Sequence, residues 1–258
     1  RKTVVVDGHT AWIGGHNVGD EYLGKDPEFG NWRDTHMRLE GPAALGAQVA
    51  FVEDWRWAAD ETLDDLTWSP TASESGNAQA VVIASGPADE LETASLMFNQ
   101  AINAATRRVW IASPYFVPDD AIVQALQLAA LRGVDVRILI PEVSDSIFVK
   151  LAAYSYFDEL KFTGVTFYRY QDGFLHQKVM MIDDTVAAVG TANFDNRSFR
   201  LNFEITAVVA DEEFAGDVER MFEADFARSR KMEPGEYDSK SYLYKVAVRL
   251  ARLAAPVL

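Results

Sequence analysis

Residues 176–183, HQKVMMID, and residues 190–193, GTAN, decide the fold of this 258-residue chain, because their pattern of polar, apolar and glycine residues occurs twice. Near the beginning, residues 2–7 read KTVVVD and residues 14–17 read GGHN. The two copies align without a gap, and four polar or special residues coincide: Lys2 with Lys178, Asp7 with Asp183, Gly14 with Gly190 and Asn17 with Asn193. Four coincidences at four matching offsets indicate an internal repeat of one structural unit.

The second copy has a histidine, His176, two residues before its lysine. On a strand, residues two apart point to the same face, so the imidazole of His176 and the ammonium of Lys178 are expected side by side. The same alignment places the partner of His176 immediately before Arg1. The chain as given therefore holds one of the two histidines that the repeat predicts, and we expect the other just upstream.

Short apolar runs alternate with longer helical patterns along the chain, which is typical of an α/β protein. Residues 69–79 lack an apolar period, so they are the expected linker, with the domain boundary near residue 75. The expected units are the C-terminal part of a first half over residues 1–68, a complete second half over residues 80–237 and a basic amphipathic segment over residues 238–258.

The apolar periods also predict the individual elements. Helices are expected over residues 45–66, 89–106, 119–132, 146–162 and 211–228. Strands are expected over residues 4–6, 11–13, 80–84, 109–113, 134–140, 165–170, 178–182, 186–189 and 203–209.

The charge and composition argue against several classes of protein. With 24 Lys and Arg residues against 39 Asp and Glu residues, the net charge of −15 argues against a broad nucleic-acid-binding face, which needs clustered positive charge. The chain has no cysteine and its four histidines are scattered, so neither a disulfide framework nor a histidine metal cage is expected. No apolar run is long enough to span a bilayer.

The pattern His-x-Lys-(x)4-Asp followed by Gly-Thr-x-Asn resembles the signature of the phospholipase D superfamily, in which two copies face each other across one active site. The likeness to the bacterial cardiolipin synthases of that superfamily extends over most of residues 1–237. It is found in these segments: GGHNVGDEYL at 14–23, WRDTH at 32–36, SPYFVP at 113–118, LRGVDVR at 131–137, GFLH at 173–176 and NFDNRSFRLNFE at 193–204. The resemblance implies a phospholipase D-like α/β fold of two pseudo-symmetric halves packed sheet to sheet with flanking helices, the first half incomplete. The sequence departs from the family in lacking the first histidine and N-terminal membrane helices.

Two imidazoles on opposite sides of one phosphorus can exchange a phosphodiester in two steps. The resemblance implies that the first-copy histidine attacks the phosphorus, and that His176 acts as general acid and then as base for the incoming alcohol. Lys2 and Lys178 can neutralise the phosphoryl oxygens, and Asn17 and Asn193 can donate amide hydrogens to them. With these donors, no divalent metal and no cofactor is required.

Four carboxylates accompany these motifs. The resemblance implies that Glu204 accepts a hydrogen bond from Nδ1 of His176, and that Asp34 is the equivalent partner of the first-copy histidine. Asp7 and Asp183 belong to the catalytic motif and follow the two lysine strands at tight turns. We favour a structural role for them, in which they bind turn amides and hold the strands in register.

Small and aromatic residues complete the candidate site. Gly14, Gly15 and Gly190 can be turn residues, positions where the backbone approaches a bound phosphate, or both. Thr191 is expected to offer its hydroxyl at the same place. Tyr115 is either half of an aromatic pair at a strand end or part of the substrate pocket wall. No role is assigned to the remaining histidines, His9, His16 and His36.

Residues 240–258 contain four basic residues and no acidic ones in an amphipathic helical pattern, whereas the rest of the chain has a net charge of −19. One interpretation is a helix that packs on the domain. The other is a helix in the membrane interface, with its basic residues near anionic headgroups. The sequence does not decide between them.

The leading hypothesis is a phosphatidyltransferase that moves a phosphatidyl group from one phosphatidylglycerol, by way of a histidine, to a second, and so makes cardiolipin and glycerol. The nearest alternative is a hydrolytic phospholipase D or head-group exchange enzyme, and a non-catalytic membrane-surface module is the alternative from another class. The expected partners are phosphatidylglycerol, other anionic phospholipids and a membrane surface, with no nucleic acid and no obligate protein partner. The resemblance implies location at the bacterial inner membrane through an N-terminal region outside this sequence. With one histidine, the chain alone is expected to be inactive.

Overall fold

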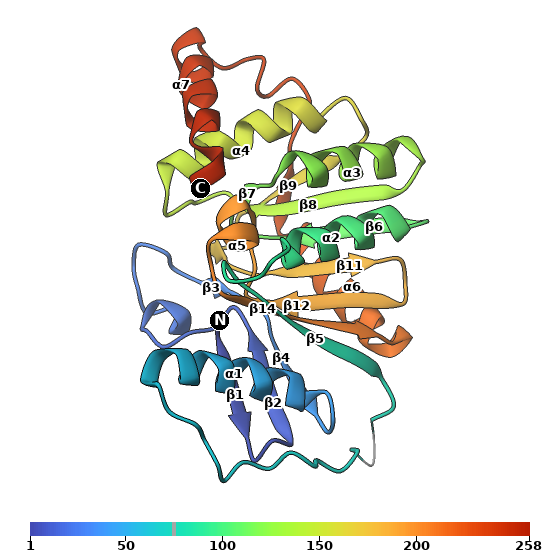
Figure 1. The fold of residues 1–258 in the computed structure, drawn as a ribbon. Helices are drawn as coiled ribbons and strands as arrows, with labels where there is room; N and C mark the ends of the chain where they lie inside the picture. Colours follow the sequence, from blue (N-terminus) through green and yellow to red (C-terminus); the bar gives the residue numbers. More distant parts are fainter. Residues whose placement is uncertain (74–75) are drawn as a thin grey trace.

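The computed structural model describes residues 1–73 and 76–258, and its two main sheets pack face to face (Figure 1). The larger sheet has eight strands in the order β15 (Ser229–Lys231), β9 (Thr166–Tyr170), β8 (Asp135–Pro141), β6 (Arg108–Ala112), β11 (Val179–Ile182), β12 (Val186–Gly190), β14 (Glu204–Ala210) and β5 (Gln79–Ser85). Strands β6, β8 and β9 are parallel, whereas the other neighbours pair antiparallel. The sheet is therefore mixed.

The smaller sheet is antiparallel and has the order β1 (Thr3–Val6), β2 (Thr10–Gly14) and β4 (His36–Glu40). It reproduces the order β11-β12-β14 of the larger sheet. Its register is also the same when Lys2 is aligned with Lys178: Thr3 pairs with Ile13 and Val179 with Val189, and Val6 pairs with Thr10 and Ile182 with Val186. The structure thus shows the repeat that the sequence predicts, at the level of residue pairing. Strand β11 is flanked by β6, whereas β1 is the outer strand of its sheet among the described residues.

The apolar side chains between the two sheets form one of two buried cores. Strands β2 and β4 contribute alternate residues such as Ile13 and Leu39, because alternate side chains of a strand point to one face. The larger sheet contributes residues such as Val189, and helices α1 (Ala44–Ala59) and α6 (Glu212–Ala227) close this core. The predicted packing of sheet on sheet is confirmed.

The other face of the larger sheet is covered by α2 (Thr93–Ala104), α3 (Asp120–Leu131) and α4 (Ile147–Leu160), which bury the second core (Figure 1). Helix α7 (Tyr242–Leu253) packs on α4. Helices α3, α4, α6 and α7 each begin at a polar side chain that accepts an otherwise unpaired amide N–H: Asp119, Ser146, Asp211 and Ser241. Over the described residues, no helix is both long and apolar enough to cross a bilayer.

The first helix is shorter than predicted. Asp60 takes a left-handed conformation with φ of +54° and its N–H bonds to the carbonyl oxygen of Arg56, which ends α1 at Ala59. Leu63 and Leu66 therefore lie beyond the helix, and the prediction of a helix to Leu66 is wrong. Leu63 and Leu66 keep the apolar spacing of a helix in the sequence although the helix itself ends at Ala59, and this spacing led to the longer prediction.

Two further differences concern a strand that was not predicted and the start of a helix. Strand β4 has no counterpart among the predicted strands, although Met37 and Leu39 alternate with polar residues. Helix α2 begins at Thr93, four residues later than predicted. The predicted linker runs into β5 at Gln79, and the domain boundary near residue 75 lies outside the described residues.

Candidate active site

The candidate site is built where two short strands from different halves of the chain meet. Strand β3 (Trp32–Arg33) pairs in parallel with β10 (Phe174–Leu175). The pairing continues for one hydrogen bond, 2.8 Å long, from the N–H of His176 to the carbonyl oxygen of Arg33. Because the strands run in the same direction, the residues that follow them come side by side. These residues are Asp34 and His176.

The side chains of Asp34 and His176 are hydrogen-bonded, with 2.8 Å between Oδ2 and Nδ1. The carboxylate of Asp34 is fully buried, and it also accepts the N–H of Thr35 at 2.8 Å and the indole N–H of Trp32 at 3.3 Å. An acceptor at Nδ1 fixes the proton on that nitrogen, so Nε2 presents its lone pair. The imidazole is thereby oriented to attack or to accept a proton at Nε2.

The pKa values of this pair support the same protonation state. Burial opposes ionisation of Asp34, but the hydrogen bond from His176 and the charge of Lys178 outweigh it and hold the pKa of Asp34 below its usual value. Burial lowers the pKa of His176, although the bond to Asp34 acts in the opposite direction. At neutral pH the pair is therefore an ionised carboxylate and a neutral imidazole.

The predicted pairing of Glu204 with His176 is wrong, because the partner of His176 is Asp34. Glu204 is buried and accepts hydrogen bonds from the hydroxyls of Thr191 and Ser198. Its backbone lies at the start of the first copy: the Arg1 backbone nitrogen is 2.8 Å from the Phe203 carbonyl oxygen, and Arg1 Nε donates to the Glu204 carbonyl oxygen at 3.0 Å. Asp34 thus lies beside the motif of the other half, whereas the Glu204 carboxylate binds Thr191 of its own motif and the Glu204 backbone contacts the start of the first copy. Asp34, which was expected to bind the first-copy histidine, is hydrogen-bonded to His176 of the second copy.

The two motif lysines act on the same site. Lys178 is buried and donates a hydrogen bond of 2.7 Å to the carbonyl oxygen of His176. Burial lowers the pKa of Lys178 to about 7, with Asp34 opposing this and the positive charge of Lys2 adding to it. The charge of Lys2 also lowers the pKa of His176. Lys2 and Lys178 are therefore electrostatically coupled, as the two-copy interpretation requires.

The buried Lys178 gives a stability prediction. Because its pKa falls from 10.5 to about 7 on folding, the unfolded chain binds more protons between these values, so the free energy of unfolding rises with pH across that interval. Lys178→Met is expected to increase the free energy of unfolding by about 2 kcal/mol or more near pH 7. That gain should shrink as the pH approaches 10.5.

Urea unfolding over this pH range measures the effect. The exposed Lys25 offers a control, since Lys25→Met should give neither the gain nor its pH dependence. A Lys178→Met variant that is destabilised equally at every pH would contradict the assignment of a buried, poorly charged lysine.

The two motif asparagines occupy different environments. The side chain of Asn193 is hydrogen-bonded to the buried carboxylate of Asp195, and its Oδ1 is a buried acceptor with no partner among the described residues. Asn17 is exposed, bonds to Tyr22 and accepts the N–H of Val18 at 2.9 Å. The pseudo-symmetry of the strands therefore does not extend to the asparagine side chains.

The motif glycines allow the backbone to approach the two carboxylate-bearing segments. A Cβ atom on Gly15 would lie 2.1 Å from Oδ1 of Asp34, and one on Gly190 would lie 2.5 Å from the carbonyl oxygen of Ile205. Gly14 is similarly close to the carbonyl oxygen of Thr35. These close contacts are sufficient to require glycine, so phosphate approach remains a prediction.

Thr191 and Tyr115 both bond to carboxylates. The hydroxyl of Thr191 is buried and donates to Glu204, so it positions that carboxylate. The hydroxyl of Tyr115 donates to Asp145, and burial together with that carboxylate raises the pKa of Tyr115. Its role as a pocket wall stays a prediction.

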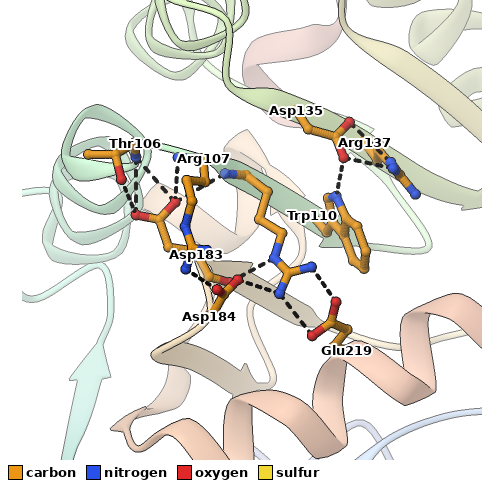
Figure 2. A network of polar contacts seen from close by, with 9 residues as sticks. Thr106, Arg107, Trp110, Asp135, Arg137, Asp183, Asp184 and Glu219 are labelled. Carbon is orange, nitrogen blue, oxygen red and sulfur yellow. Dashed lines mark hydrogen bonds and ion pairs between the residues drawn. The ribbon is translucent and has the colours of Figure 1, made fainter.

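Asp183 has structural contacts at the opposite end of β11 from Lys178 (Figure 2). Its carboxylate accepts the backbone N–H groups of Thr106, Arg107 and Arg108 at 2.7–3.2 Å and the Thr106 hydroxyl at 2.8 Å. Five residues of extended chain separate it from Lys178, which is about 16 Å. Asp7 has a similar left-handed conformation, with φ of +53° against +50° for Asp183, but its side chain is exposed. The structural role favoured for Asp183 fits these contacts.

Asp183→Asn is expected to lower the free energy of unfolding by about 1–2 kcal/mol at neutral pH, the lower part of the range for bonds to a charged group, because the site is partly exposed. Burial opposes ionisation, but the amide bonds hold the pKa of Asp183 below its usual value. The stabilisation is therefore present above the pKa that Asp183 has in the unfolded chain. It is lost as the pH falls through the lower pKa that Asp183 has in the folded protein. Denaturant titrations at neutral and acid pH test this, with Asp7→Asn as the matched control; equal losses for both variants would contradict it.

Sequence reasoning missed the aromatic side chains around His176. The rings of Trp32, Tyr22 and Phe174 lie 5.0, 6.2 and 6.0 Å from the imidazole, measured between ring centroids. Trp32 and Phe174 are the paired residues of β3 and β10, two positions before Asp34 and His176. The signal is visible in the sequence only once the two segments are known to pair. These rings shield one side of the imidazole from water.

Asp225, on α6, is a second missed residue. It is buried, and its carboxylate accepts hydrogen bonds from Nε and Nη2 of Arg33 at 2.8 and 2.9 Å. It also accepts one from Nε2 of Gln177 at 2.9 Å. Arg33 precedes Asp34, and Gln177 follows His176. One carboxylate therefore fixes the neighbours of both members of the pair.

A cavity lies elsewhere among the described residues. It has a volume of about 710 Å³ and is lined by residues such as Met37, Leu39, Ala80 and Phe214. None of the motif residues lines it, so the chemistry is assigned from side-chain geometry and not from cavity size.

Comparison with known proteins extends these observations. A family model described as cardiolipin synthase, phospholipase D-like domain, matches residues 98–226. Over its whole length the chain is 54% identical to cardiolipin synthase A of Pseudomonas aeruginosa and 52% identical to that of Pseudomonas fluorescens, covering 52% and 53% of those proteins. The chain thus spans about half the length of the curated relatives it matches.

Two solved structures have a similar fold. Phosphatidylserine synthase of Haemophilus influenzae Rd KW20 matches with a TM-score of 0.73 and 12% identity, over 100% of this chain and 70% of its own. The phospholipase D family member Nuc of Salmonella typhimurium matches with a TM-score of 0.51 and 21% identity, over 60% of this chain and 99% of its own. At these identities the likeness concerns the fold, and it agrees with the phospholipase D-like α/β fold that the resemblance implies.

Proposed function

This chain belongs to the cardiolipin synthase family of phospholipase D-like domains, and from that premise we propose that it is part of a phosphatidyltransferase that makes cardiolipin and glycerol from two molecules of phosphatidylglycerol. The observation that supports this most is the buried pair of His176 and Asp34 beside Lys178. It supplies an oriented imidazole and a cation at one place, which are the groups that phosphoryl exchange needs.

In the proposed first step, an imidazole nitrogen forms a bond to the phosphorus of one phosphatidylglycerol and the bond from phosphorus to the glycerol oxygen breaks. The departing oxygen takes a proton from Nε2 of the second imidazole, which enters this step as an imidazolium ion because the anionic phosphate favours its protonated form. In the second step, that imidazole removes a proton from the hydroxyl of another phosphatidylglycerol, whose oxygen attacks the phosphorus while the nitrogen–phosphorus bond breaks. Atoms and charges balance, and both imidazoles return to their starting state.

We assign the acid and base role to His176, and the attacking role to a histidine that the repeat places immediately before Arg1 in the longer protein. By symmetry with Asp34, Glu204 is the proposed carboxylate partner of that histidine, since the backbone of Arg1 is hydrogen-bonded to Phe203 and Glu204. The chain of 258 residues, with one of the two histidines, is expected to be inactive alone. The complete protein is proposed to act at the bacterial inner membrane.

Lys178 and Lys2 are proposed to bind the phosphoryl oxygens. The lowered pKa of Lys178 implies that an arriving phosphate brings the negative charge that favours its protonated form. Phosphate binding is then coupled to uptake of a proton. Asn193 is the proposed neutral donor, through the amide hydrogen that Asp195 does not accept, while the exposed Asn17 is the less constrained of the two.

Transfer and hydrolysis differ only in whether the second nucleophile is an alcohol or water. The aromatic rings beside His176 favour exclusion of water, and so transfer. Incubating the complete protein with phosphatidylglycerol as the sole lipid separates the two. Cardiolipin as the main product is the expected result, and phosphatidic acid as the main product would establish a hydrolytic phospholipase D in its place.

A further inference from the structure

One side of helix α7 is buried, and the opposite side is apolar and exposed. Val248 and Ala251 are buried where α7 packs on α4. Leu243, Leu250 and Leu253 are 78%, 62% and 77% exposed. Their spacing along the helix places them on one stripe, opposite the buried pair. The two alternatives left open for this segment are therefore compatible, because α7 packs on the domain and still presents a second apolar face.

The C-terminal end of α7 reaches the segment that follows Asn193 in the candidate site. The 3-10 helix η2 (Ala255–Val257) comes directly after α7. The side-chain amide of Asn196 donates to the carbonyl oxygen of Ala255 at 3.0 Å, and the N–H of Arg197 donates to that of Leu258 at 3.1 Å. Val257 is exposed at this point. The apolar stripe therefore ends near the site.

The first turn of α4 extends the apolar surface. Ile147 and Phe148 are largely exposed there, although the other apolar residues of the same helix are buried or partly buried. Asp145, just before this turn, is hydrogen-bonded to Tyr115. Figure 1 shows the C-terminal end of the chain beside this turn and β7 (Phe116–Val117). The apolar residues of α7, η2 and α4 thus gather on the same side of the molecule as Tyr115.

Positive charge accompanies this surface in an otherwise acidic chain. Residues 240–258 contain four basic residues and no acidic ones, while the remainder has a net charge of −19. Arg249 is exposed next to Leu250, at the edge of the leucine stripe. A helix with exposed leucines and basic residues along one border matches the interface of an anionic bilayer, in which acyl chains lie beneath negative headgroups.

We propose that the C-terminal apolar face, formed by Leu243, Leu250, Leu253, Val257, Ile147 and Phe148, docks on the surface of a bilayer that contains anionic phospholipid. The proposal rests on the proposed function for the choice of phosphatidylglycerol as that lipid. Docking through this face holds the site against the layer that contains the substrate, so a headgroup reaches His176 without the lipid leaving the bilayer.

Sedimentation of the 258-residue chain with vesicles tests the proposal without any turnover. Vesicles of phosphatidylcholine alone are compared with vesicles of phosphatidylglycerol and phosphatidylcholine in equal parts. The double variant Leu250→Ser/Leu253→Ser is expected to bind the anionic vesicles about tenfold or more weakly. Arg249→Gln is expected to weaken that binding about fivefold and to leave binding to phosphatidylcholine unchanged. The matched control is Leu128→Ser/Leu131→Ser, two exposed leucines on α3.

Unchanged vesicle binding of the Leu250/Leu253 variant would overturn the proposal, as would failure of the unmodified chain to bind anionic vesicles. A shift of that variant from dimer to monomer in sedimentation velocity, with vesicle binding intact, would show that the face joins two copies of the chain, and would also overturn it. Because the assay needs no catalysis, a hydrolytic product pattern in the complete protein leaves this result unaffected, and failure to dock leaves the chemistry of His176 unaffected.

Discussion

His176→Asn in the complete protein is expected to reduce phosphatidyl transfer by about 10⁴-fold or more while the fold is retained. Asparagine can keep a hydrogen bond to Asp34, but it offers neither a basic Nε2 lone pair nor a proton at that position. The loss should appear in both steps of the proposed reaction, since the same nitrogen protonates the leaving oxygen and then deprotonates the acceptor. Cardiolipin formation from phosphatidylglycerol, measured at saturating lipid, reports the effect.

His9→Asn is the matched control for that variant. His9 lies in the β1–β2 turn, where its carbonyl oxygen accepts the N–H of Gly41, away from the paired side chains of Asp34 and His176. The control should retain the activity and stability of the unmodified protein. Normal turnover in His176→Asn would remove His176 from the mechanism and leave the Asp34 bond as a structural feature.

The repeat made the strand framework predictable. Identical offsets from Lys2 to Asn17 and from Lys178 to Asn193 require the same hairpin in both copies, and the observed registers agree when the two lysines are aligned. The apolar runs of the second half are continuous because β6, β8 and β11 are buried on both faces, which makes such strands conspicuous. Strand β4 is half-exposed, so its apolar residues alternate with polar ones and give a weaker signal.

The pairing of the candidate-site carboxylates with the motif histidines was not predictable by the same route. The sequence shows which residues are equivalent in the two copies, but it does not show whether a carboxylate serves its own copy or the other. That choice depends on the parallel pairing of β3 with β10, two-residue strands far apart in the sequence. Neither strand has an apolar period of its own. The buried Asp225, which fixes Arg33 and Gln177, was hidden for a different reason, because it lies among the acidic residues of an amphipathic helix.

Asp34→Asn is expected to lower phosphatidyl transfer by about 10³-fold and to lower the pKa of His176. The matched change Glu204→Gln should leave the pKa of His176 unaltered. Asp34 raises the pKa of His176 through its hydrogen bond and charge, and burial lowers it. Removing the charge therefore leaves burial unopposed and lowers the pKa of His176 further. Glu204 acts instead on Lys178.

Titration of the His176 ring protons by NMR in the 258-residue chain separates the two carboxylates without requiring activity. A downward shift of the His176 pKa in Asp34→Asn, with none in Glu204→Gln, is the result that the 2.8 Å contact implies. The reverse pattern would restore pairing within one copy and would mean that the β3–β10 register is wrong. The measurement also tests the proposed role of Glu204. If Glu204 has no effect on the pKa of His176, its carboxylate remains available to pair with the histidine expected before Arg1.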